Sequence, residues 1–264
     1  MDNRAIGVFD SGLGGLTTVK ELHRILPQED IIYLGDTGRV PYGSRSRETI
    51  IKYARQDIAF LLQKDIKMVV AACGTVSSTL PREISANLHI VLPAAQQACA
   101  MTSRGRIGVV GTNATLRSNA FGKAIHNIRA DVQVYGNPCP LLVHLVENGL
   151  VQQENPITRL TVQMYLEPLM KEQIDTLILG CTHYPLLYDI FNELLDYQVT
   201  LIDPGRCAAG SVRDLLMKNG QLAQRQRQGI TEYNVTDETE SFNRTASIFL
   251  GEQVKGAVNR IELG

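Results

Sequence analysis

The sequence lacks any long hydrophobic run, and nothing in it approaches the roughly 18 uninterrupted apolar residues of a membrane span. It also lacks a dominant charge, because 26 Lys and Arg face 27 Asp and Glu and leave a formal net charge of −1. Without a long basic run, neither nucleic acid nor a membrane surface is expected as a partner. No signal-peptide segment stands at the N-terminus, so we expect a cytoplasmic protein.

Cysteine is scarce and irregularly spaced. The chain has five cysteines, at positions 73, 99, 139, 181 and 207, with no CxxC pair or other metal-ligand spacing. An odd number of scattered cysteines does not make a disulfide framework, so we expect free thiols in a reducing compartment. The spacing also gives no reason to expect a bound metal.

Short apolar runs alternate with helical patterns along the chain, which is typical of open α/β sheets. The 264 residues, 44% of them hydrophobic, suffice for one large or two small domains. We predict strands over residues 5–9, 30–34, 68–72, 89–92, 132–135, 174–179, 199–202 and 233–236, and a further strand from residue 106. We predict helices over residues 16–26, 46–63, 94–102, 154–171, 186–195, 206–218 and 239–250, and one that begins between 79 and 81.

The first glycine-rich turn, residues 10–15, lacks the spacing of a nucleotide site. A G-x-G-x-x-G motif would need glycine at position 17, where Thr17 stands, and no GK[ST] follows. The glycines instead allow backbone N–H groups to converge on a small anion, beside Asp10 and Ser11 at the strand end. The alternative is that Asp10 and Ser11 only cap the next helix.

The two halves of the chain repeat one organisation. The segment from Arg106 echoes the segment from Arg4, and each half has a later strand that ends in a cysteine, Cys73 or Cys181. A helix N-terminus and nearby donors favour the thiolate at such positions. A single strand-end cysteine is more often a small buried hydrophobe, but two in matching contexts favour chemistry.

Two thiols that face each other across a cleft suit the inversion of a carbon stereocentre. One group removes a proton from one face of the carbon, and the other returns a proton to the opposite face. Asp10 beside Cys73 and His183 beside Cys181 are candidates to assist, and small donors at Ser11, Thr75 and Thr182 are candidates to hold a carboxylate.

Two further segments carry candidate groups. The loop at residues 35–43 offers the Tyr42 hydroxyl and the Gly43 backbone donor, although a simple turn explains it equally well. Glu147 is an acid in the largely apolar segment 141–150, and its alternative is a surface position near a helix end.

The chain resembles glutamate racemases through four segments, residues 7–16, 33–37, 40–43 and 179–186. The resemblance implies two pseudo-symmetric α/β domains with the active site in the cleft between them, residues 1–97 with 207–264 in the first and 98–206 in the second. It implies a cofactor-independent, two-thiol interconversion of L- and D-glutamate that supplies D-glutamate to peptidoglycan. A small-molecule substrate and a homodimer are the partners that it suggests.

The resemblance also assigns roles by motif. It implies Cys73 and Cys181 as the acid/base thiols, Asp10 and His183 as their supporting groups and Glu147 as a further acid. The implied substrate contacts are Asp10, Ser11, Pro41, Tyr42, Gly43, Gly74, Thr75, Thr115, Thr182 and His183.

One position departs from the family. Its members usually have Asn after the first thiol, where this chain has Gly74, so only the backbone N–H of Gly74 is left as a donor. Two alternatives therefore stay open: a related racemase acting on aspartate or another amino acid, and a racemase-like binding protein with impaired catalysis.

Overall fold

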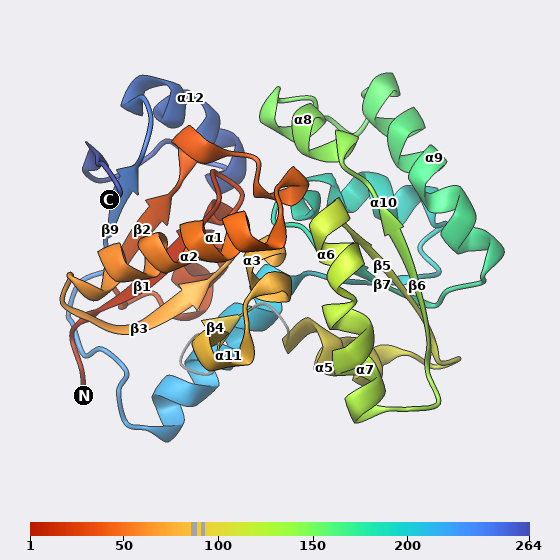
Figure 1. Ribbon diagram of the computed structural model, residues 1–264, viewed down its shortest axis with the longest axis horizontal. Helices are drawn as coiled ribbons and strands as arrows, with labels where there is room; N and C mark the ends of the chain where they lie inside the picture. Colours follow the sequence, from red (N-terminus) through yellow and green to blue (C-terminus); the bar gives the residue numbers. More distant parts are fainter. Residues whose placement is uncertain (86–88, 91–92) are drawn as a thin grey trace.

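The computed structural model describes residues 1–85, 89–90 and 93–264, and it contains two parallel sheets set side by side (Figure 1). The larger sheet has the order β10-β9-β2-β1-β3-β4 and the smaller one β6-β5-β7-β8. The larger sheet consists of β1 (Ala5–Asp10), β2 (Ile31–Gly35), β3 (Ile66–Ala71), β4 (His89–Ile90), β9 (Thr231–Val235) and β10 (Val258–Arg260). The smaller sheet consists of β5 (Arg106–Gly111), β6 (Gln133–Pro138), β7 (Thr176–Leu179) and β8 (Thr200–Ile202). The expected α/β fold class is confirmed.

Helices cover these sheets. Those nearest the larger sheet are α1 (Leu16–Ile25), α2 (Arg47–Leu62), α3 (Gly74–Thr79), α4 (Arg82–Ser85), α11 (Pro204–Lys218) and α12 (Thr239–Leu250). Those nearest the smaller sheet are α5 (Pro93–Met101), α6 (Asn113–Ser118), α7 (Ala120–Ile128), α8 (Leu141–Glu147), α9 (Pro156–Lys171) and α10 (Tyr188–Leu194). The described residues also form the short 3-10 helices η1 (Thr37–Arg39), η2 (Tyr42–Ser44) and η3 (Tyr184–Leu187). No helix in the described part of the chain is long and apolar enough to cross a membrane.

Strand β1 shows why the larger sheet is covered on both faces. Its side chains alternate, so that Ile6 and Val8 pack in one core cluster with α1, whereas Phe9 packs in another with α2. Since both faces of a parallel sheet are buried, the strands read as continuous apolar runs rather than as alternating ones.

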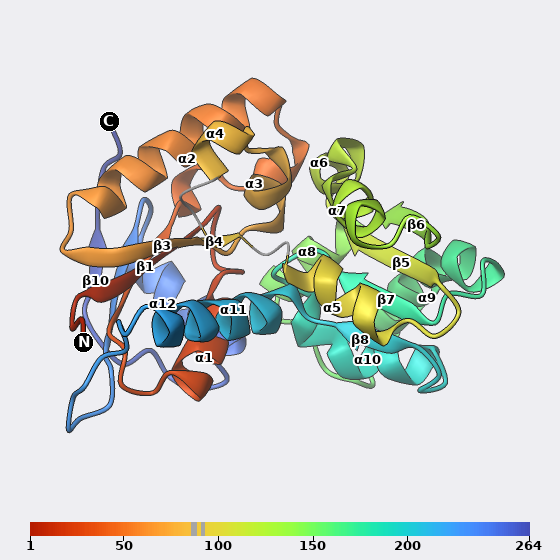
Figure 2. The ribbon, with the colours of Figure 1, turned by 90° about the horizontal axis from the view of Figure 1, so that it is seen from below.

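The C-terminal part of the chain returns to the larger sheet. Helix α11 leaves the end of β8 and packs against α1, and Figure 2 shows the two helices running beside each other below the sheet. Strand β9 then pairs with β2 in parallel register, with Tyr33 opposite Tyr233. The return places α12 next to the junction between the two sheets.

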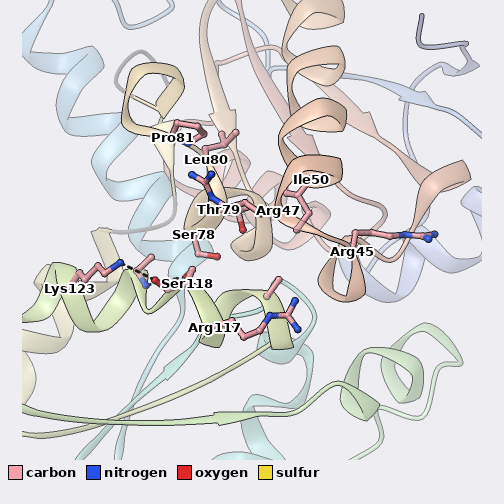
Figure 3. Close-up of a pocket in the computed structure, with 12 residues that line it drawn as sticks. Arg45, Arg47, Ile50, Ser78, Thr79, Leu80, Pro81, Arg117, Ser118 and Lys123 are labelled. Carbon is pink, nitrogen blue, oxygen red and sulfur yellow. Dashed lines mark hydrogen bonds between the residues drawn. The ribbon is translucent and has the colours of Figure 1, made fainter.

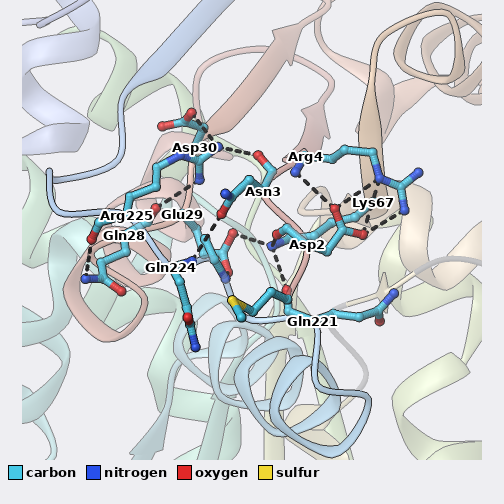
Figure 4. A network of polar contacts seen from close by, with 12 residues as sticks. Asp2, Asn3, Arg4, Gln28, Glu29, Asp30, Lys67, Gln221, Gln224 and Arg225 are labelled. Atoms are coloured by element: carbon cyan, nitrogen blue, oxygen red, sulfur yellow. Dashed lines mark hydrogen bonds and ion pairs between the residues drawn. The ribbon is translucent and has the colours of Figure 1, made fainter.

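A buried ion pair stabilises this return (Figure 4). Lys67 at the start of β3 pairs with Glu29, and both side chains are buried. The ammonium group also donates to the carbonyl oxygens of Asp2 and Gln221, while Glu29 accepts from the backbone N–H of Ala223 at 2.8 Å. These contacts join the N-terminus, β3 and the segment after α11.

Several predicted elements differ from the structure. The helix expected from residues 79–81 begins at Gly74, directly after Cys73, and a separate short helix follows at Arg82. Glycine is a weak helix former, which concealed this start. Helices α6, α7 and α8 and strand β10 were not predicted. The strand expected at 89–92 is described at His89–Ile90, and residues 91 and 92 lie outside the described residues.

Candidate active site

The two strand-end cysteines line one small cavity between the sheets, of about 160 Å³. Cys73 follows β3 of the larger sheet and Cys181 follows β7 of the smaller one, and both are at least 90% buried. The carboxyl ends of parallel strands are the usual place for ligands in open α/β sheets. Other predicted residues that line the cavity are Ser11, Pro41, Tyr42, Gly43, Gly74, Thr75, Thr182 and His183.

On one side of the cavity, Cys181 belongs to a chain of polar groups in which Cys181 and His183 are buried and Glu147 is partly exposed. Its Sγ lies 3.7 Å from Nδ1 of His183, and Nε2 of the same ring lies 3.1 Å from Oε1 of Glu147. Burial of the ring lowers the pKa of His183, but the hydrogen bonds with Cys181 and Glu147 outweigh it and raise that pKa to about 10. The raised pKa favours the protonated ring of His183, whose Nδ1–H then points at Cys181 Sγ.

On the other side, Cys73 is held as a thiol. Burial and the nearby Asp10 carboxyl group raise the pKa of Cys73 to about 12, although its Sγ hydrogen-bonds to Ser11 Oγ at 3.4 Å. We expected the start of α3 to favour the thiolate here, and this expectation is wrong. The helix has fewer than two turns, and its N-terminus does not offset the loss of water and the adjacent acid.

Three of the predicted site residues stand behind the cavity wall. Asp10 is fully buried and accepts from the backbone N–H of Gly12 at 2.9 Å, and burial raises its pKa. Glu147 reaches the site through His183, as described above. Thr115 bonds at 3.0 Å to Thr112, which itself lines the cavity.

Sequence reasoning missed part of the lining. Thr112 hydrogen-bonds across the cleft to Thr75 at 2.9 Å, and Pro140, Val143 and His144 come from the start of α8. Thr112 was detectable as a hydroxyl at a strand exit, in the position that Ser11 holds in the first half. The α8 residues have no such signal, because only the tertiary fold brings that helix to the cleft.

We expected the Tyr42 hydroxyl to be available to a substrate in the cavity, but it is engaged by other side chains. It hydrogen-bonds to the buried carboxyl groups of Asp36 and Asp57. Among the residues that the structure describes, no group of three or more His, Cys, Asp or Glu is placed to hold a metal ion.

A model of the Asp/Glu/Hydantoin racemase family matches residues 6–212 of the chain. The chain belongs to this family. It is 42% identical to the glutamate racemase of Geobacter metallireducens over 98% of this chain and 97% of that protein. Its structure is similar to that of glutamate racemase isoform RacE1 from Bacillus anthracis, with a TM-score of 0.93, 36% identity and coverage of 100% and 99% of the two chains. It is also similar to the glutamate racemase of Francisella tularensis in complex with D-glutamate, with a TM-score of 0.91, 36% identity and coverage of 99% and 98%. The resemblance stated from the sequence is confirmed.

Within this racemase family, Gly74 is the departure, and its surroundings explain what glycine allows. A Cβ atom added to Gly74 would overlap the carbonyl oxygen of Gly180, and one added to Gly14 would overlap the Thr182 hydroxyl. Both contacts join the larger sheet to the turn that carries Cys181. Glycine at these two positions lets the two halves of the racemase fold approach each other closely.

A second cavity, of about 570 Å³, is lined by several basic side chains (Figure 3). Arg45 and Arg47 line it from the larger sheet's side, and Arg117 and Lys123 from α6 and α7. Among the described residues that line it, none is Asp or Glu. The lining of this second cavity is therefore positively charged.

Proposed function

We propose that this protein is a glutamate racemase that interconverts L- and D-glutamate without a cofactor. One observation carries the proposal: a single cavity has a buried cysteine on each side, one beside His183 and the other near Asp10. A two-base inversion needs one group ready to accept a proton and one ready to donate. The similarity to glutamate racemases indicates that glutamate is the substrate.

The proposed reaction is a proton transfer through the substrate's Cα. The Cys181 thiolate takes the Cα proton from one face, and the electron pair left on carbon is delocalised into the α-carboxylate. The Cys73 thiol then gives its proton to the opposite face, so Cys181 ends as the thiol and Cys73 as the thiolate. The opposite enantiomer uses the same two groups in the reverse order.

Each supporting residue has a role in this proposal. His183, which is hydrogen-bonded to Glu147, stabilises negative charge on Cys181. Asp10 assists proton transfer to and from the sulfur of Cys73. Hydroxyl and backbone N–H donors at Ser11, Gly74, Thr75 and Thr182 bind the α-carboxylate, and residues Pro41–Gly43 hold the side-chain carboxylate. Thr115 orients Thr112 at the edge of the site.

Several wider expectations belong to the same proposal. The two halves act as domains, residues 1–97 with 207–264 and residues 98–206, with the cleft between them. The protein works in the cytoplasm and supplies D-glutamate to peptidoglycan, in a homodimer. Analytical ultracentrifugation of the purified protein tests the last point, because a monomer under assay conditions contradicts it.

The decisive experiment measures racemisation and isotope exchange together. Purified, reduced protein in D₂O, without pyridoxal phosphate, should convert L-glutamate to D-glutamate that carries solvent deuterium at Cα. Cys73→Ser and Cys181→Ser should each abolish most of this turnover, because a serine hydroxyl is a far weaker acid than a thiol. Cys99→Ser is the matched control, since Cys99 packs in a separate core cluster.

The outcomes separate the alternatives. Faster turnover of aspartate than of glutamate would identify a related racemase with another substrate. Absence of both turnover and deuterium exchange for every amino acid tested would leave a binding protein. Full activity in either serine variant would refute the two-thiol mechanism.

A further inference from the structure

A buried polar cluster lies behind the loop at residues 40–44, all of which line the catalytic cavity. We call these five residues the cavity loop. The side chains of Asp36 and Asp57 are fully buried, and Tyr42 is almost completely so. Asp36 follows β2, Asp57 lies on α2 and Tyr42 lies in η2, so three elements meet at this cluster. Tyr42 is the member that belongs to the cavity loop.

The contacts within the cluster are well defined. Nε of Arg39 lies 2.6 Å from Oδ2 of Asp36, and its terminal nitrogen lies 3.3 Å from Oδ1 of Asp57. Oδ1 of Asp36 also accepts from the Thr236 hydroxyl at 2.8 Å. The Tyr42 hydroxyl oxygen contacts Oδ2 of Asp36 and lies 3.1 Å from Oδ2 of Asp57. Two carboxyl groups therefore share one phenol and one guanidinium.

Both contacts of the Tyr42 hydroxyl oxygen are hydrogen bonds if one carboxyl group of the cluster keeps its proton. A phenol has a single hydrogen to donate, yet the Tyr42 oxygen contacts two carboxyl oxygens. If Tyr42 donates to Asp36, which pairs with Arg39, the second contact needs a hydrogen on Asp57. A protonated Asp57 supplies it by donating to the Tyr42 oxygen. This arrangement leaves one negative and one positive charge in the cluster, whereas two carboxylates would leave an unpaired buried charge.

We propose that Asp57 is a positioning residue for the cavity loop, which it holds in place as a neutral carboxylic acid through the Tyr42 hydroxyl. The proposal deepens the glutamate racemase function and rests on it for its kinetic consequences. Loss of the Asp57 proton places two anions around one phenol oxygen, and Tyr42 is then repelled from its site. Because Pro41 and Gly43 flank Tyr42 and face the cavity, substrate binding weakens when Tyr42 moves.

The surroundings of Asp57 favour the neutral acid. Burial and the neighbouring Asp36 carboxyl group raise the pKa of Asp57 well above its usual range, Arg39 and Tyr42 act in the opposite direction, and the more distant Asp10 raises it further. On α2 itself, Gln56 accepts from Arg39 at 2.6 Å, and the Tyr53 ring lies 4.1 Å from the guanidinium carbon. Arg39 is the cation in this set, and its closest carboxylate contact is with Asp36.

The test compares Asp57→Asn with Asp57→Ala in the full-length protein. The Asn amide has the shape of the neutral acid and keeps a hydrogen for the Tyr42 oxygen, so KM for glutamate should stay within about 3-fold of wild type. The Ala variant removes the hydrogen given to that oxygen and one of the two carboxyl partners of Arg39, so KM should rise by about 10-fold or more with a smaller change in kcat. The matched control is Asp65→Asn, at an exposed position just after α2.

The pH dependence distinguishes a proton from a structural contact. A raised pKa means that the neutral acid persists at low and neutral pH and is lost as the pH rises through the folded-state value. KM of the wild type should therefore rise in alkaline solution, and this rise should be absent in Asp57→Asn, which has no proton to lose. An alkaline rise of the same size in Asp57→Asn, or a KM as high as that of Asp57→Ala, would overturn the proposal.

A spectroscopic measurement separates this proposal from the racemase function. The infrared difference between wild type and Asp57→Asn at pH 7 should contain the carbonyl stretch of one protonated carboxyl group. Absence of that band overturns the proposal whether or not the protein turns over glutamate. If the band is present but the wild type does not racemise glutamate, the racemase function fails while the proton on Asp57 stands.

Discussion

Gly74 and Gly180 approach each other so closely that a methyl group on Gly74 would overlap the Gly180 carbonyl oxygen. Gly74 opens α3 beside Cys73, and Gly180 precedes Cys181, so this contact joins the backbones next to the two thiols. The contact fixes how closely the two halves of the cleft approach. Glycine at position 74 therefore has a structural use besides leaving a backbone donor for the substrate.

We expect Gly74→Ala to lower kcat/KM by about 10-fold or more, because the added methyl group must push α3 away from Gly180 and so displace Cys73 from its position. Steady-state racemisation and thermal unfolding measure the two effects. Gly210→Ala is the matched control, since a Cβ there meets no atom within 4 Å and alanine favours the helix. Wild-type kinetics in Gly74→Ala would show that the close contact is dispensable.

Glu147→Gln should move the alkaline limit of activity to lower pH. The pKa of His183, raised to about 10 from its usual 6.5, keeps the imidazolium charged below about pH 10. The stability that this charged ring contributes is likewise complete below 6.5 and lost as the pH rises toward 10. Glutamine keeps a hydrogen-bonding side chain but removes the negative charge. The alkaline limb of the kcat/KM profile should therefore move down by about one pH unit.

The pH dependence of kcat/KM measures that shift, and the exposed Glu154→Gln serves as its control. A profile for Glu147→Gln that coincides with wild type would mean that the 3.1 Å contact does not set the charge of His183. The acidic limb should change less, because Glu147 acts on the imidazolium rather than on Cys73.

The central strands and both thiols were predictable because their signals are local. Ile6, Val8 and Phe9 form an apolar run that ends at a glycine-rich turn, and Cys73 and Cys181 occupy equivalent ends of such runs. Parallel sheets bring strand ends together by topology alone. The shared cavity therefore followed from the order of strands and helices along the chain.

The electrostatic state of the site was not predictable in the same way. The raised pKa of Cys73 depends on its nearly complete burial near Asp10, which sequence spacing does not specify. The link from Glu147 to His183 joins the end of α8 to the turn after β7, across 36 residues of sequence. The Tyr42 hydroxyl was expected to face the substrate, and only the packing of α2 shows that carboxyl groups engage it.

Glu29→Gln should destabilise the fold by about 3–5 kcal/mol, because it leaves the Lys67 ammonium buried with an incomplete set of partners. Urea unfolding at pH 7 measures the change. Glu232→Gln removes the acid of a half-exposed pair with Lys64, and it should cost no more than about 1 kcal/mol. Equal effects of the two substitutions would contradict the assignment. Activity per folded molecule should be unchanged in both variants, since neither pair contacts the cavity.

Phe249→Ala should affect both stability and catalysis, because the C-terminal helix α12 reaches the site through this ring. Phe249 is fully buried, and its ring meets His183 edge to face with centroids 5.2 Å apart. Removal of a buried phenyl group costs about 3–5 kcal/mol. It also leaves the imidazole free to tilt away from Cys181, so kcat/KM should fall by about 10-fold or more.

The matched control for this substitution is Phe60→Ala on α2, where the ring is only partly buried and lies outside the cavity. That variant should lose less stability and keep its kcat/KM. Urea unfolding and racemisation assays on both variants, at a temperature where each is folded, separate the two effects. If Phe249→Ala loses stability but keeps wild-type kcat/KM, the ring supports the core only and His183 is positioned by Glu147 and Cys181 alone.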